Sequence, residues 1–166
     1  KTPRRKFLAK IKQESFFQIM NWQRISRLTD YYHYKVNHDG GSILAKILYI
    51  YYIRKRNILS AKLGMEIGTE NIDKGLVVYH YNNVVNGQSK IGKNLHLHGG
   101  NVIGNAGPQD PRCPTIGNNV MLGAGAKVIG HVTIADNIKI AAGAVVVNSF
   151  ETPGITIAGV PARRVK

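Results

Sequence analysis

Residues 116–147 read IGNNVMLGAGAKVIGHVTIADNIKIAAGAVVV, the most regular part of the sequence. An aliphatic residue recurs at every sixth position without a slip, followed each time by a small or aliphatic residue: Ile116-Gly117, Leu122-Gly123, Val128-Ile129, Ile134-Ala135, Ile140-Ala141 and Val146-Val147. An α-helix would place apolar residues three and four positions apart, so this period predicts short strands joined by tight turns. In such a parallel β-helix each aliphatic side chain points inward and stacks on its equivalent in the next coil.

The same six-residue period continues upstream of this stretch. It gives Ile72, Val78 and Val84, then one extra residue, and then Ile91, Leu97 and Ile103. A non-repeating excursion, residues 105–115 (NAGPQDPRCPT), separates the two blocks. Because three hexapeptides make one triangular coil, the repeats predict about four coils.

The N-terminal part of the chain lacks this period. We therefore expect a small α-helical region over residues 1–60, followed by a β-helix domain over residues 61–166. The apolar pattern predicts one helix over residues 14–28 and a second over residues 42–56, the latter capped by Ser42.

The second expected helix is apolar nearly all round over residues 43–53. It is too short to span a bilayer and is interrupted by Lys46. Two interpretations stay open: the helix packs on the β-helix or on a neighbouring subunit, which we favour, or it lies on an anionic membrane surface through the basic residues 54–56.

Composition narrows the class of protein. The 166 residues include 23 Lys and Arg against nine Asp and Glu, a net charge of +14 that favours an anionic partner. No motif of the common nucleic-acid-binding modules is present, so we expect no nucleic-acid partner. The single cysteine, Cys113, excludes an internal disulfide, and the basic start lacks the apolar stretch of a signal peptide. We therefore expect a cytoplasmic protein.

The segment GLVVYHYNNVVN, residues 75–86, carries His80 two residues after an inward-facing valine. Together with the repeats, with Gly123-Ala-Gly-Ala-Lys127 and with the ending Ala158-Gly-Val-Pro-Ala-Arg163, it resembles the hexapeptide-repeat acyltransferase family. Within that family the resemblance is to the serine acetyltransferase branch and its relatives that acetylate capsular polysaccharide. It implies a left-handed parallel β-helix, a homotrimer and acetyl-CoA as co-substrate.

His80 is the residue type that acyl transfer to a hydroxyl needs. An alcohol is a poor nucleophile near neutral pH and requires a base that titrates near the working pH. The resemblance implies that His80 takes the hydroxyl proton and returns it to the sulfur of CoA, without an acyl-enzyme. Glu66 and Asp73 are the upstream acids available to orient its ring. The alternative is an ordinary surface histidine.

The acceptor is indicated by departures from the serine acetyltransferase pattern. Those enzymes carry acids where this chain has Met65 and Tyr79, and a second histidine where it has Cys113. We therefore favour a sugar hydroxyl over free serine. Arg112 matches an arginine associated with the substrate carboxylate, so an acidic sugar stays open, as does a plain loop role. The other residues expected to line the acceptor cleft are Asn82, Asn83 and His98, with residues 105–115 as its wall.

Acetyl-CoA needs small residues beside its pantetheine arm and cations near its phosphates. By resemblance, the small residues are Gly104, Gly123, Ala124, Ala141 and Ala142. The cations that we expect near the nucleotide are Lys127, Lys139, Arg163 and Arg164, which are otherwise ordinary surface residues.

The leading hypothesis is O-acetylation of a sugar hydroxyl in a surface or capsular polysaccharide or its precursor. Serine O-acetyltransferase is the first alternative. A zinc-dependent hydratase like the γ-class carbonic anhydrases would use His80, His96 and His98, but their spacing lacks that class's pair of histidines five apart, so we expect no metal. A non-catalytic trimeric scaffold is the last alternative.

Overall fold

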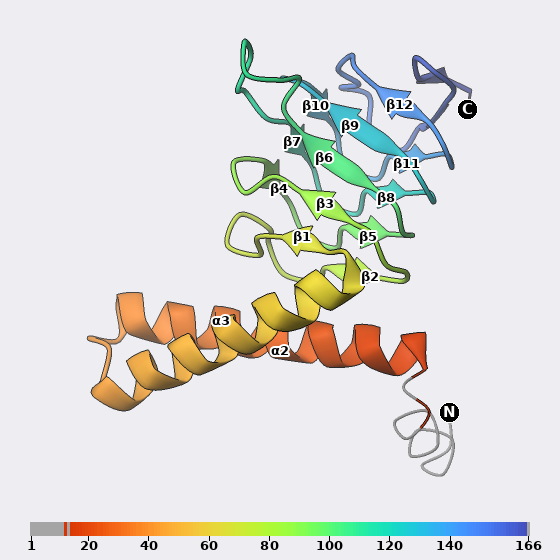
Figure 1. Cartoon of the computed structure of the whole chain (residues 1–166). Helices are drawn as coiled ribbons and strands as arrows, with labels where there is room; N and C mark the ends of the chain where they lie inside the picture. Colours follow the sequence, from red (N-terminus) through yellow and green to blue (C-terminus); the bar gives the residue numbers. More distant parts are fainter. Residues whose placement is uncertain (1–11, 13, 166) are drawn as a thin grey trace. The chain divides into compact units, whose positions relative to one another are not determined.

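Figure 1 shows the computed structural model of the chain, which describes residues 12 and 14–165. The chain divides into two compact units with their boundary between Leu63 and Gly64. The first contains helices α2 (Ser15–His38) and α3 (Ile43–Leu63), and the second contains only short strands and turns.

Helices α2 and α3 form an antiparallel pair (Figure 1). Trp22 of α2 is fully buried, and its indole Nε1–H donates a hydrogen bond of 2.7 Å to Ser60 Oγ of α3. Ser42 Oγ accepts a hydrogen bond from the Ala45 N–H at 3.2 Å, which confirms the predicted cap of α3.

Both helices run further than the apolar pattern predicts. The helix expected over residues 14–28 continues to His38, and the one expected over residues 42–56 continues to Leu63. In the added part of α2, the ring of Tyr32 stacks on Tyr52 of α3 with centroids 5.5 Å apart. The extension is therefore stabilised by aromatic packing, which a search for aliphatic periodicity misses.

The second unit is a parallel β-helix with three sheets (Figure 1). The first sheet holds β1 (Glu66–Ile67), β3 (Val84–Val85), β6 (Val102–Gly104), β9 (Lys127–Ile129) and β12 (Val145–Val146). The second holds β4 (Lys90–Ile91), β7 (Thr115–Ile116) and β10 (Thr133–Ile134). The third holds β2 (Val77–Val78), β5 (His96–Leu97), β8 (Met121–Leu122), β11 (Lys139–Ile140), β13 (Thr156–Ala158) and β14 (Arg163–Arg164). Only the pairing of β13 with β14 is antiparallel among these strands.

The core is the inward stack that the period predicts. Every predicted inward residue from Ile91 to Val146 is buried: Ile91, Leu97, Ile103, Ile116, Leu122, Val128, Ile134, Ile140 and Val146. Burying one such side chain contributes roughly 1.5–3 kcal/mol, so repetition along the axis makes the unit stable.

One inward position was predicted wrongly. Val85, not Val84, is buried and pairs with Ile103 of the next coil. The extra residue therefore lies before Val84, in the turn of residues 79–83 between β2 and β3. This turn contains His80.

Candidate active site

The His80 turn is longer than its equivalents in the following coils. Residues 79–83 connect β2 to β3, whereas residues 98–101, 123–126 and 141–144 make the same connection in later coils. Strand register pairs Val78 with Leu97 and Val84 with Val102, so one residue is inserted between these pairs. We call this edge of the β-helix, formed by the four turns, the His80 corner.

Backbone hydrogen bonds between coils identify the inserted residue as His80. The Gly143 N–H donates to Ala124 O and the Gly125 N–H to Gly99 O, each at 2.8 Å. In the same ladder the Gly100 N–H donates to Tyr81 O at 3.0 Å. This series of bonds between coils therefore uses the carbonyl of Tyr81 as an acceptor and not the carbonyl of His80.

The side chain of His80 is exposed, and its main chain lies against the next coil. A Cβ atom added at Gly99 would lie 2.6 Å from His80 Cβ, closer than any real contact. Gly99 has a φ of +106°, which also favours glycine. The imidazole of His80 makes no hydrogen bond within residues 14–165, so neither Glu66 nor Asp73 orients it in this structure.

Two fully buried asparagines lie beneath the His80 corner. Asn83 Nδ2 donates to His80 O at 2.7 Å, and Asn83 Oδ1 accepts from the Asn101 N–H at 3.2 Å. Asn101 Oδ1 accepts from the Gly99 N–H at 3.0 Å, and its Nδ2 donates to Gly123 O at 2.7 Å. The sequence predicted Asn83 in the acceptor cleft, but its buried amide binds the backbone of the turn instead. Asn101 was not predicted at all.

Aromatic side chains line the outer face of the third sheet just before His80. Tyr79 Oη and His96 Nδ1 are hydrogen-bonded at 3.1 Å, and the Tyr79 ring stacks on His98 with centroids 4.5 Å apart. His98 lies beside Tyr79 because the register pairs the preceding residues, Val78 and Leu97. Asn82 is exposed in the same turn with a φ of +61°.

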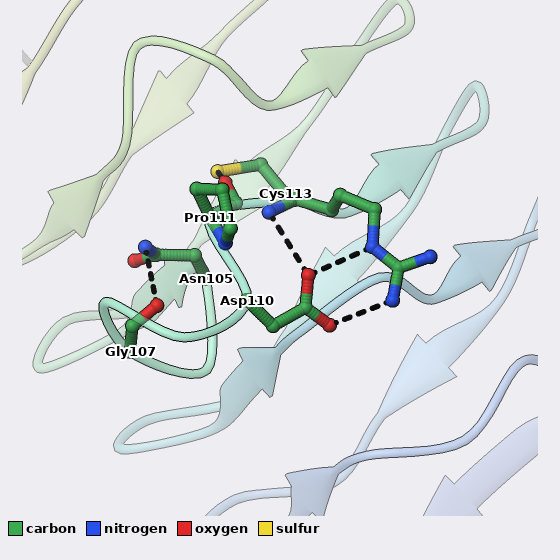
Figure 2. Close-up of polar contacts among 6 residues, drawn as sticks. Asn105, Gly107, Asp110, Pro111 and Cys113 are labelled. Carbon is green, nitrogen blue, oxygen red and sulfur yellow. Dashed lines mark hydrogen bonds and ion pairs between the residues drawn. The ribbon is translucent and has the colours of Figure 1, made fainter.

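Figure 2 shows the excursion between β6 and β7. The Arg112 guanidinium binds Asp110 with two hydrogen bonds, Nε to Oδ1 at 2.7 Å and Nη2 to Oδ2 at 2.9 Å. These bonds lower the pKa of Asp110 below its ordinary value and raise the pKa of Arg112. The sequence leaves two roles open for Arg112, binding an acceptor's carboxylate or a plain loop role, and in this structure its guanidinium binds a carboxylate of its own loop.

The same loop is closed by hydrogen bonds to the carbonyl of Gly107, and Figure 2 shows the one from Asn105. Asn105 Nδ2 donates to Gly107 O at 3.3 Å, and the Asp110 N–H donates to the same carbonyl at 3.2 Å. Cys113 Sγ lies 3.6 Å from Pro111 O, where its thiol donates a weak hydrogen bond.

The structure separates the small residues expected along CoA into two places. Gly123, Ala124, Ala141 and Ala142 belong to the His80 corner, whereas Gly104 ends β6 at the far end of that strand. A Cβ at Gly123 would lie 2.5 Å from Ala142 N, so the two turns are packed closely. The expected cations are all exposed on strands of the later coils: Lys127, Lys139, Arg163 and Arg164.

No group of three or more His, Cys, Asp or Glu side chains among the described residues is arranged to hold a metal ion. The cluster of His96, His98 and Tyr79 is therefore a hydrogen-bonded and stacked surface feature in this structure.

Comparison with known proteins agrees with this architecture. Residues 113–148 match the family described as bacterial transferase hexapeptide (six repeats). A Neisseria gonorrhoeae serine acetyltransferase structure is 30% identical, with a TM-score of 0.65, over 90% of this chain and 55% of that one. The same enzyme in complex with serine is 29% identical, with a TM-score of 0.62, over 90% and 57%.

A serine acetyltransferase in complex with CoA is 27% identical, with a TM-score of 0.58, over 89% of this chain and 57% of that one. This chain spans little more than half the length of these relatives. No curated protein matches it. The expected fold, a left-handed parallel β-helix with an N-terminal helical region, and the resemblance to the serine acetyltransferase branch are confirmed.

Proposed function

We propose that this chain is an acetyl-CoA-dependent O-acetyltransferase in which His80 is the general base. The observation that carries the proposal is the His80 corner, where an exposed imidazole shares one edge of the β-helix with closely packed small residues. Small side chains leave room for a narrow thioester arm beside the base. A relative with the same fold binds CoA.

In the proposed reaction the imidazole of His80 acts first as a base and then as an acid. His80 accepts the proton of the acceptor hydroxyl as its oxygen attacks the acetyl carbonyl carbon. The tetrahedral intermediate then loses the C–S bond, and the CoA sulfur receives the proton from the imidazolium. Cys113 has no part in this scheme, because the acetyl group passes directly between the two substrates. The family resemblance supports a homotrimer as the working assembly.

Two acceptor classes remain as candidates. The comparisons favour free serine, since a relative has been solved with serine bound. The residues of the site favour a saccharide: Met65 is buried where the serine enzymes carry an acid, and Tyr79 presents an aromatic surface beside His80. Arg112, bound to Asp110, has its guanidinium already engaged with a carboxylate. The saccharide is accordingly the acceptor that these departures support, whether in a surface polysaccharide or its precursor.

The test is a thiol-release assay with acetyl-CoA and a panel of free serine, uronic and sialic acids, and neutral oligosaccharides. His80→Ala should lower kcat by roughly 100-fold or more, the usual contribution of a general base. His131→Ala, which removes another exposed histidine, should leave kcat unchanged. Turnover retained by His80→Ala would remove His80 as the base, and the active acceptor identifies the substrate class.

We further propose that α3 contacts an anionic membrane surface. Its exposed residues Ile43, Ile47, Ile50, Tyr51 and Ile58 are spaced to share one face of the helix, and Ile43 is 79% exposed. No helix of the described residues is long and apolar enough to cross a membrane.

The charge of α3 indicates what covers this face. The helix has five basic residues and no acidic one. Lys46 and Lys55 are exposed beside the apolar face. A second copy of the helix would bring these cations together, whereas anionic lipid headgroups complement them while the apolar side chains enter the boundary of the bilayer.

A further inference from the structure

The turn that contains His80 is hydrogen-bonded differently from the last two turns of the His80 corner. In those two turns the backbone closes on itself: the Ala126 N–H donates to Gly123 O at 3.1 Å, and the Ala144 N–H donates to Ala141 O at 3.2 Å. In the longer turn the His80 carbonyl lies outside the ladder between coils. Its hydrogen bond comes from the side chain of Asn83.

Asn83 and Asn101 occupy one stack position that the next two coils fill with alanine. The Val84 N–H donates to Asn101 O, the Val102 N–H to Ala126 O and the Lys127 N–H to Ala144 O. Positions 83, 101, 126 and 144 therefore lie one above another, and all four are buried. Alanine satisfies this position in an ordinary coil, so the fold itself does not need an amide there.

One amide lies in the turn that contains the inserted residue and the other in the turn stacked directly on it, whereas the two turns beyond them have alanine. A buried amide is costly unless its hydrogen bonds are made, and here both ends of both side chains are bonded. The chain of bonds runs from His80 O through Asn83 to Asn101, and from Asn101 to Gly99 and Gly123. It joins three successive turns of the His80 corner.

We infer that Asn83 and Asn101 are positioning residues that hold the inserted His80 outward from the corner, through a buried amide ladder that replaces the backbone closure of an ordinary turn. The hydrogen bonds of the two amides fix the backbone of the turn whatever the role of the imidazole. Its catalytic consequence rests on the proposed function of His80.

The decisive test is a thermal double-mutant cycle. Asn83→Ala in the full chain leaves His80 O without its donor and the buried Asn101 N–H without its acceptor, and Tm should fall by roughly 5 °C or more. Deleting His80 together with Asn83→Ala restores both the length and the alanine of the later turns. In the background lacking His80, Asn83→Ala should therefore cost little or no Tm. An equal loss of Tm in both backgrounds would show that the Asn83 amide stabilises the coil whether or not His80 is present, and would overturn the inference.

Activity supplies the second measurement, with acetyl-CoA and the acceptor that is active in the thiol-release assay. Asn83→Ala and Asn101→Ala should each lower kcat by about tenfold to 100-fold, since small displacements of a reacting group cost that much, while KM for acetyl-CoA changes less than about twofold. Asn137→Gly removes an amide that accepts a bond from Asn119 Nδ2 at another corner, and it should leave kcat unchanged. If kcat is unchanged in Asn83→Ala while His80→Ala is inactive, the positioning role is refuted. If His80→Ala is active, the proposed base is refuted instead, and the Tm cycle alone then tests whether the two amides hold the longer turn.

Discussion

An exposed histidine can act as a base only if its backbone is fixed, because a flexible turn spreads the imidazole over many orientations. At the His80 corner, Gly99 provides the opposing surface. It is the residue that lets the main chain of His80 approach the next coil, since any side chain there would overlap with His80 Cβ.

Replacing Gly99 by Ala is therefore expected to displace His80 rather than simply strain the backbone. We expect kcat to fall by about tenfold or more, with a smaller change in KM for acetyl-CoA, measured by thiol release. Gly154→Ala is the matched control: Gly154 also has a positive φ, +76°, but a Cβ there meets nothing within 4 Å. Both variants bear the cost of a left-handed alanine, about 1–2 kcal/mol, so equal kcat losses would contradict a specific effect on His80.

At the scale of elements, the repeat region could be predicted because each inward position has the same environment in every coil. The insertion could not be placed by the same logic, since Val84 and Val85 are both aliphatic and either suits an inward position. Asn83 and Asn101 were missed as buried residues because asparagine is usually exposed, and their burial depends on bonds to distant turns. The length of α2 was underestimated because Tyr32 packs on a residue of another helix.

The excursion of residues 105–115 carries a prediction about pH. Hydrogen bonds from Arg112 lower the pKa of Asp110, so the pair stabilises the loop at pH values above the ordinary aspartate pKa, about 3.9. That contribution is lost as pH falls through the lowered pKa. Carbon-13 NMR titration of the carboxyl groups should show Arg112→Ala raising the pKa of Asp110 toward its ordinary value.

Asp136 is an internal control for this titration. Its pKa is also lowered, but by hydrogen bonds from the backbone and side chain of Asn118. Arg112→Ala should leave the pKa of Asp136 unchanged. An Asp110 pKa that does not move, or that moves together with that of Asp136, would contradict the assigned cause.

Across the whole molecule, the net charge of +14 is larger than the four positive charges that we expect near the CoA phosphates. Part of that excess is concentrated on α3, where exposed Lys46 and Lys55 accompany an exposed apolar face. Attraction between such a helix and anionic lipid combines an electrostatic term, which salt screens, with burial of apolar side chains, which salt does not weaken.

The double variant Lys46→Glu and Lys55→Glu should therefore weaken co-sedimentation with vesicles of phosphatidylglycerol and phosphatidylcholine, and binding by the wild-type chain should fall as salt rises. Arg24→Glu and Arg27→Glu on α2 remove equally exposed charges and change the net charge by the same amount, so this pair should retain most of the binding. Equal losses in both pairs would mean that net charge alone, not the face of α3, drives attraction. If the wild-type chain binds no vesicles and the α3 variants change its oligomeric state instead, the apolar face is a contact between subunits and the membrane proposal is wrong.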